Sequence, residues 1–224
     1  MTNKPRWYRS LRKHPSALLL AAQLLSLVLY PLLDTAHSQR VLFSAFALVV
    51  VPLAVWVVGQ SKSANWIAWL LALPAIVLAT SAVVFSMPSL IVWSALLEAA
   101  LYFYAAGSLI GYMLEDHLVT TDELFAAAAT FTLLAWGFAY AFFICQVWVP
   151  GSFTGAVEPE RPRQWLELLF LSFSTLSGVG NGDIIPLSSQ ARVIVMFEQF
   201  AGVGYIATVV SRLIGLSTAR IQSR

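Results

Sequence analysis

The fold of this chain is decided by the stretch Phe173-Ser-Thr-Leu-Ser-Gly-Val-Gly-Asn-Gly-Asp183, in which every second residue from 178 to 182 is glycine. Residues 177–182 contain too much glycine for a stable helix, so we expect extended backbone there. Glycines at alternate positions permit positive φ angles and let successive carbonyl groups point the same way. Several such segments around one axis would form rings of oxygen atoms that can replace the hydration shell of an ion.

The residues before this stretch predict a short helix over 164–175. Twelve helical residues rise about 18 Å, which is too little to cross a hydrocarbon core of about 30 Å. Irregular backbone at membrane depth is tolerated only where protein or a water-filled path surrounds it. We therefore expect a re-entrant loop over 164–183, whose short helix directs the partial negative charge of its C-terminus toward a cation path.

The composition of the whole chain supports a membrane setting. Of the 224 residues, 59% are hydrophobic and only 11% are charged, whereas soluble domains average about 25% charged residues. This excludes a soluble enzyme and a nucleic-acid-binding module. A membrane helix needs about 20 mostly apolar residues, and the chain has room for six. We expect an all-α membrane protein with spans over 17–33, 41–58, 66–85, 90–114, 124–149 and 191–216.

The basic residues predict how these spans are oriented. With six spans both termini lie on one side of the membrane, and nine of the 13 Lys and Arg residues fall on that side. Because Lys and Arg are enriched in cytoplasmic loops, we expect both termini to be cytoplasmic. The single cysteine, Cys145, leaves no partner for an intrachain disulfide.

The glycine-rich stretch resembles the pore signature of potassium channels, whose filter reads Thr-Val-Gly-Tyr-Gly-Asp. Four residues match this filter: Val179, Gly180, Gly182 and Asp183. The resemblance to bacterial ion channels with a two-helix pore extends over residues 118–215. It implies a selectivity filter over Ser177–Asp183 and a hydroxyl-bearing Thr175 at the end of the pore helix.

The resemblance also implies an assembly and a location. It implies a homotetramer in the lipid of a bacterial inner membrane, with potassium or another monovalent cation at five backbone carbonyls: Ser177, Gly178, Val179, Gly180 and Asn181. A pore domain over 115–216 would follow a peripheral four-helix domain over 17–114. Cytoplasmic segments over 1–16 and 217–224 would flank these two domains.

Two positions depart from the potassium-channel pattern. Gly178 stands where the family has a threonine that supplies side-chain oxygens, and Asn181 stands where it has an aromatic residue that packs behind the filter. These departures leave two alternatives beside a potassium-preferring channel. One is a non-selective channel for sodium and potassium, and the other is a non-conducting pseudo-channel that acts as a scaffold or sensor.

The last apolar run carries candidate hinge and gate residues. Gly202 and Gly204 permit either a bend in the helix or close packing against another helix. Four apolar residues follow at helical spacing: Ile206, Val209, Val210 and Leu213. A ring of such residues could close the cytoplasmic mouth by dewetting, or they could contact lipid and other helices.

The charges within the spans bear on gating. Span 90–114 holds no Lys or Arg, so a charged voltage-sensor helix is not expected. Its only charge is Glu98, and Glu198 lies in the last span; both should face protein or water. We expect Glu198 to support the filter, and Glu98 to be either a proton-sensitive link or a satisfied interhelical hydrogen-bond partner. Without a soluble regulatory domain, gating would depend on the membrane domain, lipid, protons or an unidentified regulatory subunit.

Enzymes and transporters fit the sequence poorly. The chain has three histidines, all outside the predicted spans or at their ends, so we expect no intramembrane catalytic residues. No His/Cys cluster suggests a bound metal cofactor. A secondary transporter usually shows an internal repeat with broken helices in both halves, and we find no such repeat.

Overall fold

The computed structural model describes residues 15–30, 50–57, 59, 65–85, 87–115 and 120–215, and this part of the chain is mostly helical. Within it, four helical stretches are long and apolar enough to cross a membrane. They are α4 (Asn65–Val84), α5 (Pro88–Glu115), α6 (Thr121–Trp148) and the stretch Ser189–Gly215, which begins as α8 (Ser189–Tyr205). The third to sixth predicted spans are thus confirmed as helices.

The first two predicted spans are less complete in the described residues. The first corresponds to α2 (Pro15–Leu29), an apolar helix of 15 residues. The second, predicted over 41–58, lies mostly outside the described residues, of which 50–57 are helical. The number of complete membrane-spanning helices in the described part is therefore four rather than six.

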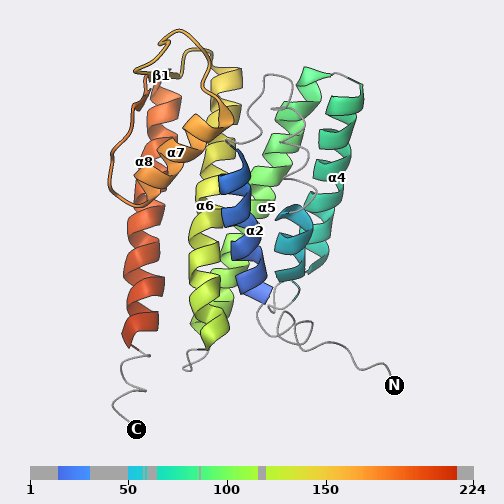
Figure 1. Cartoon of the computed structure of the whole chain (residues 1–224), viewed down its shortest axis with the longest axis vertical. Helices are drawn as coiled ribbons and strands as arrows, with labels where there is room; N and C mark the ends of the chain where they lie inside the picture. Colours follow the sequence, from blue (N-terminus) through green and yellow to red (C-terminus); the bar gives the residue numbers. More distant parts are fainter. Residues whose placement is uncertain are drawn as a thin grey trace.

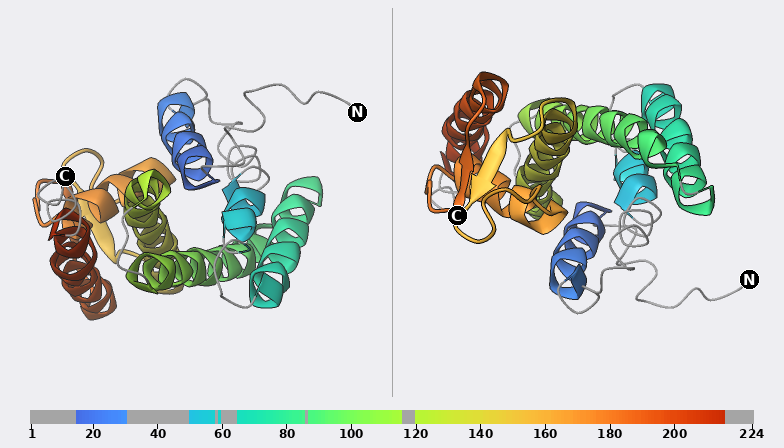
Figure 2. Two further views of the ribbon diagram at one scale, coloured as in Figure 1. Left: turned by 90° about the horizontal axis from the view of Figure 1, so that it is seen from below. Right: turned by 90° about the horizontal axis from the view of Figure 1, so that it is seen from above.

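Helix α6 is the centre of the bundle. It packs against α2, α5, α8 and the short helix α7 (Trp165–Leu176). Its side chains Trp136, Tyr140 and Phe142 are almost completely buried. Seen along the bundle axis, α4 and α8 lie at opposite ends of the helix bundle, with α5 and α6 between them (Figure 2).

The start of α6 shows why this helix begins where it does. The Thr120 side chain accepts a hydrogen bond from the Glu123 amide at 3.3 Å, as an N-cap residue does. Acidic Asp122 and Glu123 in the first turn complement the positive end of the helix dipole. Asp122 also accepts hydrogen bonds from the amide and the hydroxyl of Ser16, at 3.3 and 3.0 Å. These bonds fix the start of α2 against the start of α6.

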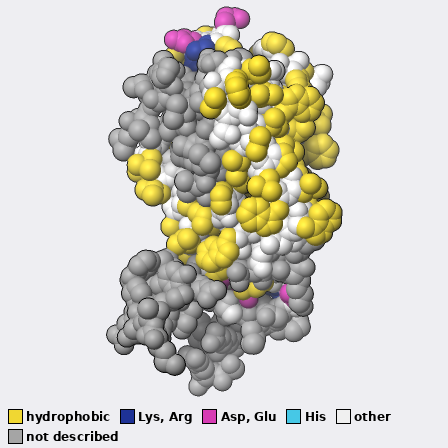
Figure 3. All heavy atoms as spheres, turned by 90° about the vertical axis from the view of Figure 1, so that its right-hand side faces the viewer, with side chains coloured by type: hydrophobic (Ala, Val, Ile, Leu, Met, Phe, Trp, Pro, Cys, Tyr) yellow, Lys and Arg dark blue, Asp and Glu magenta, His cyan; other side chains and the backbone are white. Residues whose placement is uncertain are grey.

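The outer face of the bundle is apolar. Viewed from the α4 side, hydrophobic side chains cover the middle of the molecule and charged ones lie near its ends (Figure 3). Helix α4 alone exposes several large apolar side chains, including Trp66, Leu70 and Val77. Monomeric soluble proteins rarely expose continuous apolar patches of this kind, so this face is suited to lipid.

Candidate functional site

The segment between α6 and α8 leaves one end of the bundle and returns to it. Strand β1 (Phe153–Gly155) pairs antiparallel with β2 (Ile184–Pro186), so that Gly155 lies opposite Ile184. Between the strands, α7 descends obliquely beside α6 and α8, and the chain then climbs back toward β1 (Figure 1). The strand pair thus holds together the two ends of a loop that contains the glycine-rich stretch.

Helix α7 covers Trp165–Leu176, where the sequence predicts a helix over 164–175. Gln164 and Glu167 form a capping box, in which the Gln164 amide donates to the Glu167 carboxylate at 2.5 Å. One face of α7 is buried through Leu168, Leu169 and Leu176. Its position is therefore fixed by a cap at the start and by apolar packing along its length.

Arg163 organises the linker that leads into α7. Its side chain is fully buried and donates to the backbone carbonyls of Val157 at 3.1 Å, Glu158 at 2.5 Å and Arg161 at 2.9 Å. Its guanidinium also lies 3.6 Å from the Glu167 carboxylate. A buried arginine that satisfies several carbonyls holds an otherwise irregular loop in one shape.

The glycine-rich residues form a loop directly after α7, and we call residues 177–183 the filter segment. Gly178 and Gly180 have φ angles of +73° and +66°, a region that L side chains rarely adopt. The Gly178 amide donates to the Thr175 carbonyl and the Gly180 amide to the Ser174 carbonyl, each at 3.1 Å. Both amides therefore point back toward the end of α7.

These amide directions fix the directions of two carbonyls. In a planar trans peptide, the carbonyl of one residue and the amide N–H of the next point to opposite sides. The carbonyls of Ser177 and Val179 therefore point away from α7. The Val179 side chain is 71% exposed in the single chain. This part of the filter segment presents backbone oxygens on its free side.

The Asn181 carbonyl has the opposite direction. It accepts a hydrogen bond from the Ser174 hydroxyl at 2.5 Å, so it points toward α7. The next anchor is Asp183, whose carbonyl accepts from the Ala156 amide at 3.1 Å and joins the segment to the linker. The five carbonyls predicted to bind a cation thus do not all point the same way.

Glu198 of α8 lies behind α7. Its side chain is completely buried, and one carboxylate oxygen accepts a hydrogen bond from the Ser172 hydroxyl. The same hydroxyl also contacts the Ala135 carbonyl of α6 at 2.7 Å. Ser172 therefore joins three helices at one buried point, and Glu198 contacts α7 rather than the filter segment itself.

We expect Ser172→Ala to destabilise the contact between α7 and α8. The substitution removes the hydroxyl from two buried acceptors, at a cost of about 2 kcal/mol in the free energy of unfolding. Thermal unfolding in detergent, followed by tryptophan fluorescence, measures this change. Ser177→Ala is the matched control, because the Ser177 hydroxyl lies in an exposed turn. Equal stability of both variants and the wild type would contradict this role of Ser172.

The two candidate hinge glycines have different surroundings. A Cβ atom at Gly202 would lie 2.0 Å from the Leu176 carbonyl oxygen, whereas one at Gly204 would meet nothing within 4 Å. Gly202 is therefore a close-packing position, where α8 touches the end of α7. Directly after Gly204 and Tyr205, the helix forms a π-helical turn over Ile206–Val210.

The candidate gate residues fall on different sides of this helix. Val209 and Leu213 are buried in the core of the chain, and Val210 is half-buried against it. Ile206 is 44% exposed. Val209 and Leu213 thus take the helix-contact alternative within the single chain, and the ring of gate residues stays a prediction.

Glu98 of α5 is buried beside aromatic side chains. The Tyr140 hydroxyl of α6 donates a hydrogen bond to its carboxylate, and Oε2 of Glu98 has no hydrogen-bond partner in the described part of the chain. The Tyr140 ring lies 4.3 Å from the ring of Trp165, the first residue of α7. A continuous set of contacts therefore leads from Glu98 through Tyr140 to the start of α7.

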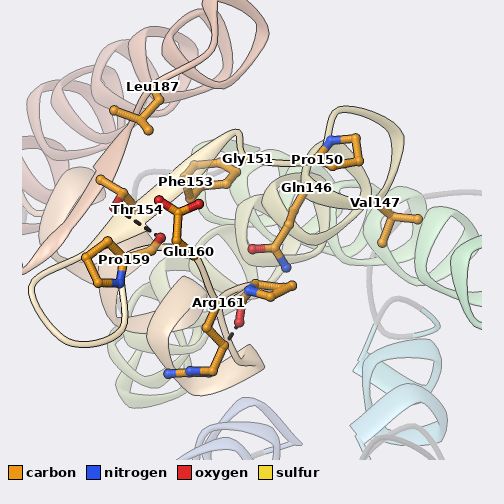
Figure 4. Close-up of a pocket in the computed structure, with 11 residues that line it drawn as sticks. Gln146, Val147, Pro150, Gly151, Phe153, Thr154, Pro159, Glu160, Arg161 and Leu187 are labelled. Atoms are coloured by element: carbon orange, nitrogen blue, oxygen red, sulfur yellow. Dashed lines mark hydrogen bonds between the residues drawn. The ribbon is translucent and has the colours of Figure 1, made fainter.

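A separate pocket of about 460 Å³ lies in the linker outside the filter segment (Figure 4). Its walls come from the end of α6, from β1 and from the turn around Glu160 and Arg161. The Thr154 hydroxyl donates to the Pro159 carbonyl at 3.3 Å across one side of it. None of its lining residues belongs to the filter segment, so the pocket is separate from the candidate site.

Comparison with known proteins places these features in a family. Residues 99–218 match the family model described as "Ion channel", which covers more than half of the chain. The chain therefore belongs to this ion channel family, whose pore unit has two membrane helices and is potassium-channel-like. No curated protein and no solved structure matches the chain. Membership indicates a multi-pass membrane transport protein rather than an enzyme.

Proposed function

We propose that this protein is a homotetrameric channel that conducts monovalent cations, preferentially potassium, through the filter segment 177–183. The observation that carries this proposal is the direction of the Ser177 and Val179 carbonyls, which point away from α7. Four copies around an axis would turn these oxygens into rings that can coordinate a dehydrated cation. In this arrangement α7 is the pore helix and residues 164–183 form a re-entrant loop.

The exposed face of α8 supports an assembly of several chains. Met196, Phe197, Phe200 and Val203 are all largely exposed, and Phe200 is 79% exposed. A ring of carbonyl oxygens needs several copies of the single filter segment, and closed cyclic symmetry supplies them. Neighbouring subunits would cover this apolar face on the side of the pore.

The proposed gate uses only one of the four candidate gate residues of each chain. Ile206 is the candidate that remains on the exposed side of the last helix, at the start of the π-helical turn. Such turns are frequent at functional sites of helices. A ring of four Ile206 side chains would close the pore by dewetting. Glu98 and its contacts with Tyr140 would link the peripheral helices, lipid or a regulatory subunit to the pore helix.

A flux assay on purified protein in liposomes tests this function. We expect potassium-loaded proteoliposomes to release potassium faster than sodium-loaded ones release sodium, and to retain N-methylglucamine. Gly180→Ala should lower potassium flux about tenfold, because alanine is disfavoured at a φ of +66° by about 1–2 kcal/mol. Gly107→Ala is the control, since a Cβ there meets nothing within 4 Å.

Two outcomes would contradict this proposal. Equal sodium and potassium flux would favour the non-selective channel, which has one observation behind it: the Asn181 carbonyl points toward α7 instead of joining the other oxygens. No flux at any pH or lipid composition would favour the pseudo-channel. In both cases, ion release from liposomes without protein gives the background flux.

A further inference from the structure

Ser174 holds the filter segment at three points. Its carbonyl accepts hydrogen bonds from the Gly180 amide at 3.1 Å and from the Ser177 hydroxyl at 3.2 Å. Its own hydroxyl donates to the Asn181 carbonyl at 2.5 Å. The carbonyl contact turns the oxygen of Val179 toward the free side of the segment. The hydroxyl contact has the opposite effect and keeps the oxygen of Asn181 on the side of α7.

The residue that follows the Asn181 carbonyl is a glycine with ordinary van der Waals distances around it. Gly182 has no side chain, and the atoms nearest to the place of a Cβ lie at 3.8 Å in Phe170, 3.9 Å in Ile184 and 4.0 Å in the Ser174 hydroxyl. Glycine also permits backbone angles that other residues avoid. Without the hydroxyl contact, rotation of the peptide after Asn181 would bring its carbonyl to the same side as those of Ser177 and Val179.

We propose that the Ser174 hydroxyl is a latch that withholds the Asn181 carbonyl from the cation path, and that its release adds an oxygen ring to the filter. This inference rests on the proposed function. Ser174 thereby acts as a positioning residue for ion selectivity, since the number of coordinating oxygens is one determinant of potassium preference. The latched segment has fewer oxygen rings, so it should prefer potassium over sodium less strongly than the unlatched segment does.

The exposed position of the bond between Ser174 and Asn181 indicates how much its loss changes the ratio of latched to unlatched filters. The contact lies at an exposed site, so the carbonyl can exchange the hydroxyl for water or a cation. A neutral hydrogen bond of this kind changes the ratio of two states about fivefold. Ser174→Ala should therefore raise the ratio of unlatched to latched filters about fivefold, and Ser174→Thr, which keeps a hydroxyl, should leave the ratio near its wild-type value.

Reversal potentials in planar bilayers with potassium on one side and sodium on the other test the latch. We expect Ser174→Ala to show a higher potassium-to-sodium permeability ratio than the wild type, and Ser174→Thr to show the wild-type ratio. Thr80→Val is the control, because it also removes a hydroxyl that bonds to a backbone carbonyl, at 2.8 Å from Ile76, but this bond lies within α4 and outside the filter segment.

The possible failures are distinguishable. If the wild type conducts and Ser174→Ala has the same or a lower permeability ratio, or conducts nothing, the hydroxyl only supports the loop and the latch is wrong. A change in Thr80→Val as large as that in Ser174→Ala would overturn it as well. If neither the wild type nor any variant conducts, the proposed function fails, and the latch fails with it.

Discussion

Gly202→Ala is expected to prevent correct docking of α8 on the end of α7. The new Cβ would lie 2.0 Å from the carbonyl oxygen and 2.8 Å from the carbonyl carbon of Leu176, and both are backbone atoms that cannot rotate away. Overpacking of this kind costs about 3 kcal/mol. Because Leu176 ends the helix that supports the filter segment, we also expect loss of potassium flux. Thermal unfolding and the liposome assay measure the two effects.

Gly204→Ala is the matched control for this prediction. It lies on the same helix two residues away, and a Cβ there meets no atom within 4 Å. Alanine is favoured over glycine within a helix by about 1 kcal/mol, so this variant should be as stable as the wild type or more stable. If Gly202→Ala unfolds at the same temperature as Gly204→Ala, the close contact between α8 and Leu176 does not exist.

Arg163→Met is expected to release the linker between α6 and α7. The substitution keeps an apolar side chain of similar length but leaves the carbonyls of Val157, Glu158 and Arg161 without their donor. Hydrogen bonds from a charged donor contribute about 1.5–3 kcal/mol each, so we expect a loss of at least about 3 kcal/mol. Hydrogen–deuterium exchange should increase over residues 153–163.

Arg161→Met provides the comparison. Arg161 pairs with Glu158 at 3.0 Å and with Glu167 at 2.9 Å, but its side chain is 31% exposed. Partly exposed ion pairs contribute about 1 kcal/mol or less. Exchange in this variant should remain close to that of the wild type. The buried role of Arg163 would be contradicted if the two variants showed equal exchange.

The sequence predicted the elements of the pore region better than the contacts between them. A short helix before a glycine-rich loop followed from the number of apolar residues and from the spacing of Gly178, Gly180 and Gly182. The roles of Ser172 and Ser174 did not, because each hydroxyl contacts a carbonyl or carboxylate brought to it by the fold. A serine in a helix has no local signal for such a partner.

The last helix shows a second feature that the sequence did not predict, namely which of its side chains are buried. Helical spacing grouped Ile206, Val209, Val210 and Leu213, but spacing alone does not say which side of the helix faces the neighbouring helices. The π-helical turn over Ile206–Val210 also changes the angular spacing that a regular α-helix would give. The different roles of Gly202 and Gly204 likewise become visible only in the structure, because Leu176 lies against Gly202 and not against Gly204.

The strand pair that closes the pore region has a consequence for how the protein is made. Its partners β1 and β2 lie only about 30 residues apart in the chain, and α7 packs on the helix immediately before them. Contacts between residues close in sequence form faster than distant ones. In the proposed tetramer, each chain can therefore shape its own filter segment before it meets another copy. Association of the chains would then bring together filter segments that are already folded.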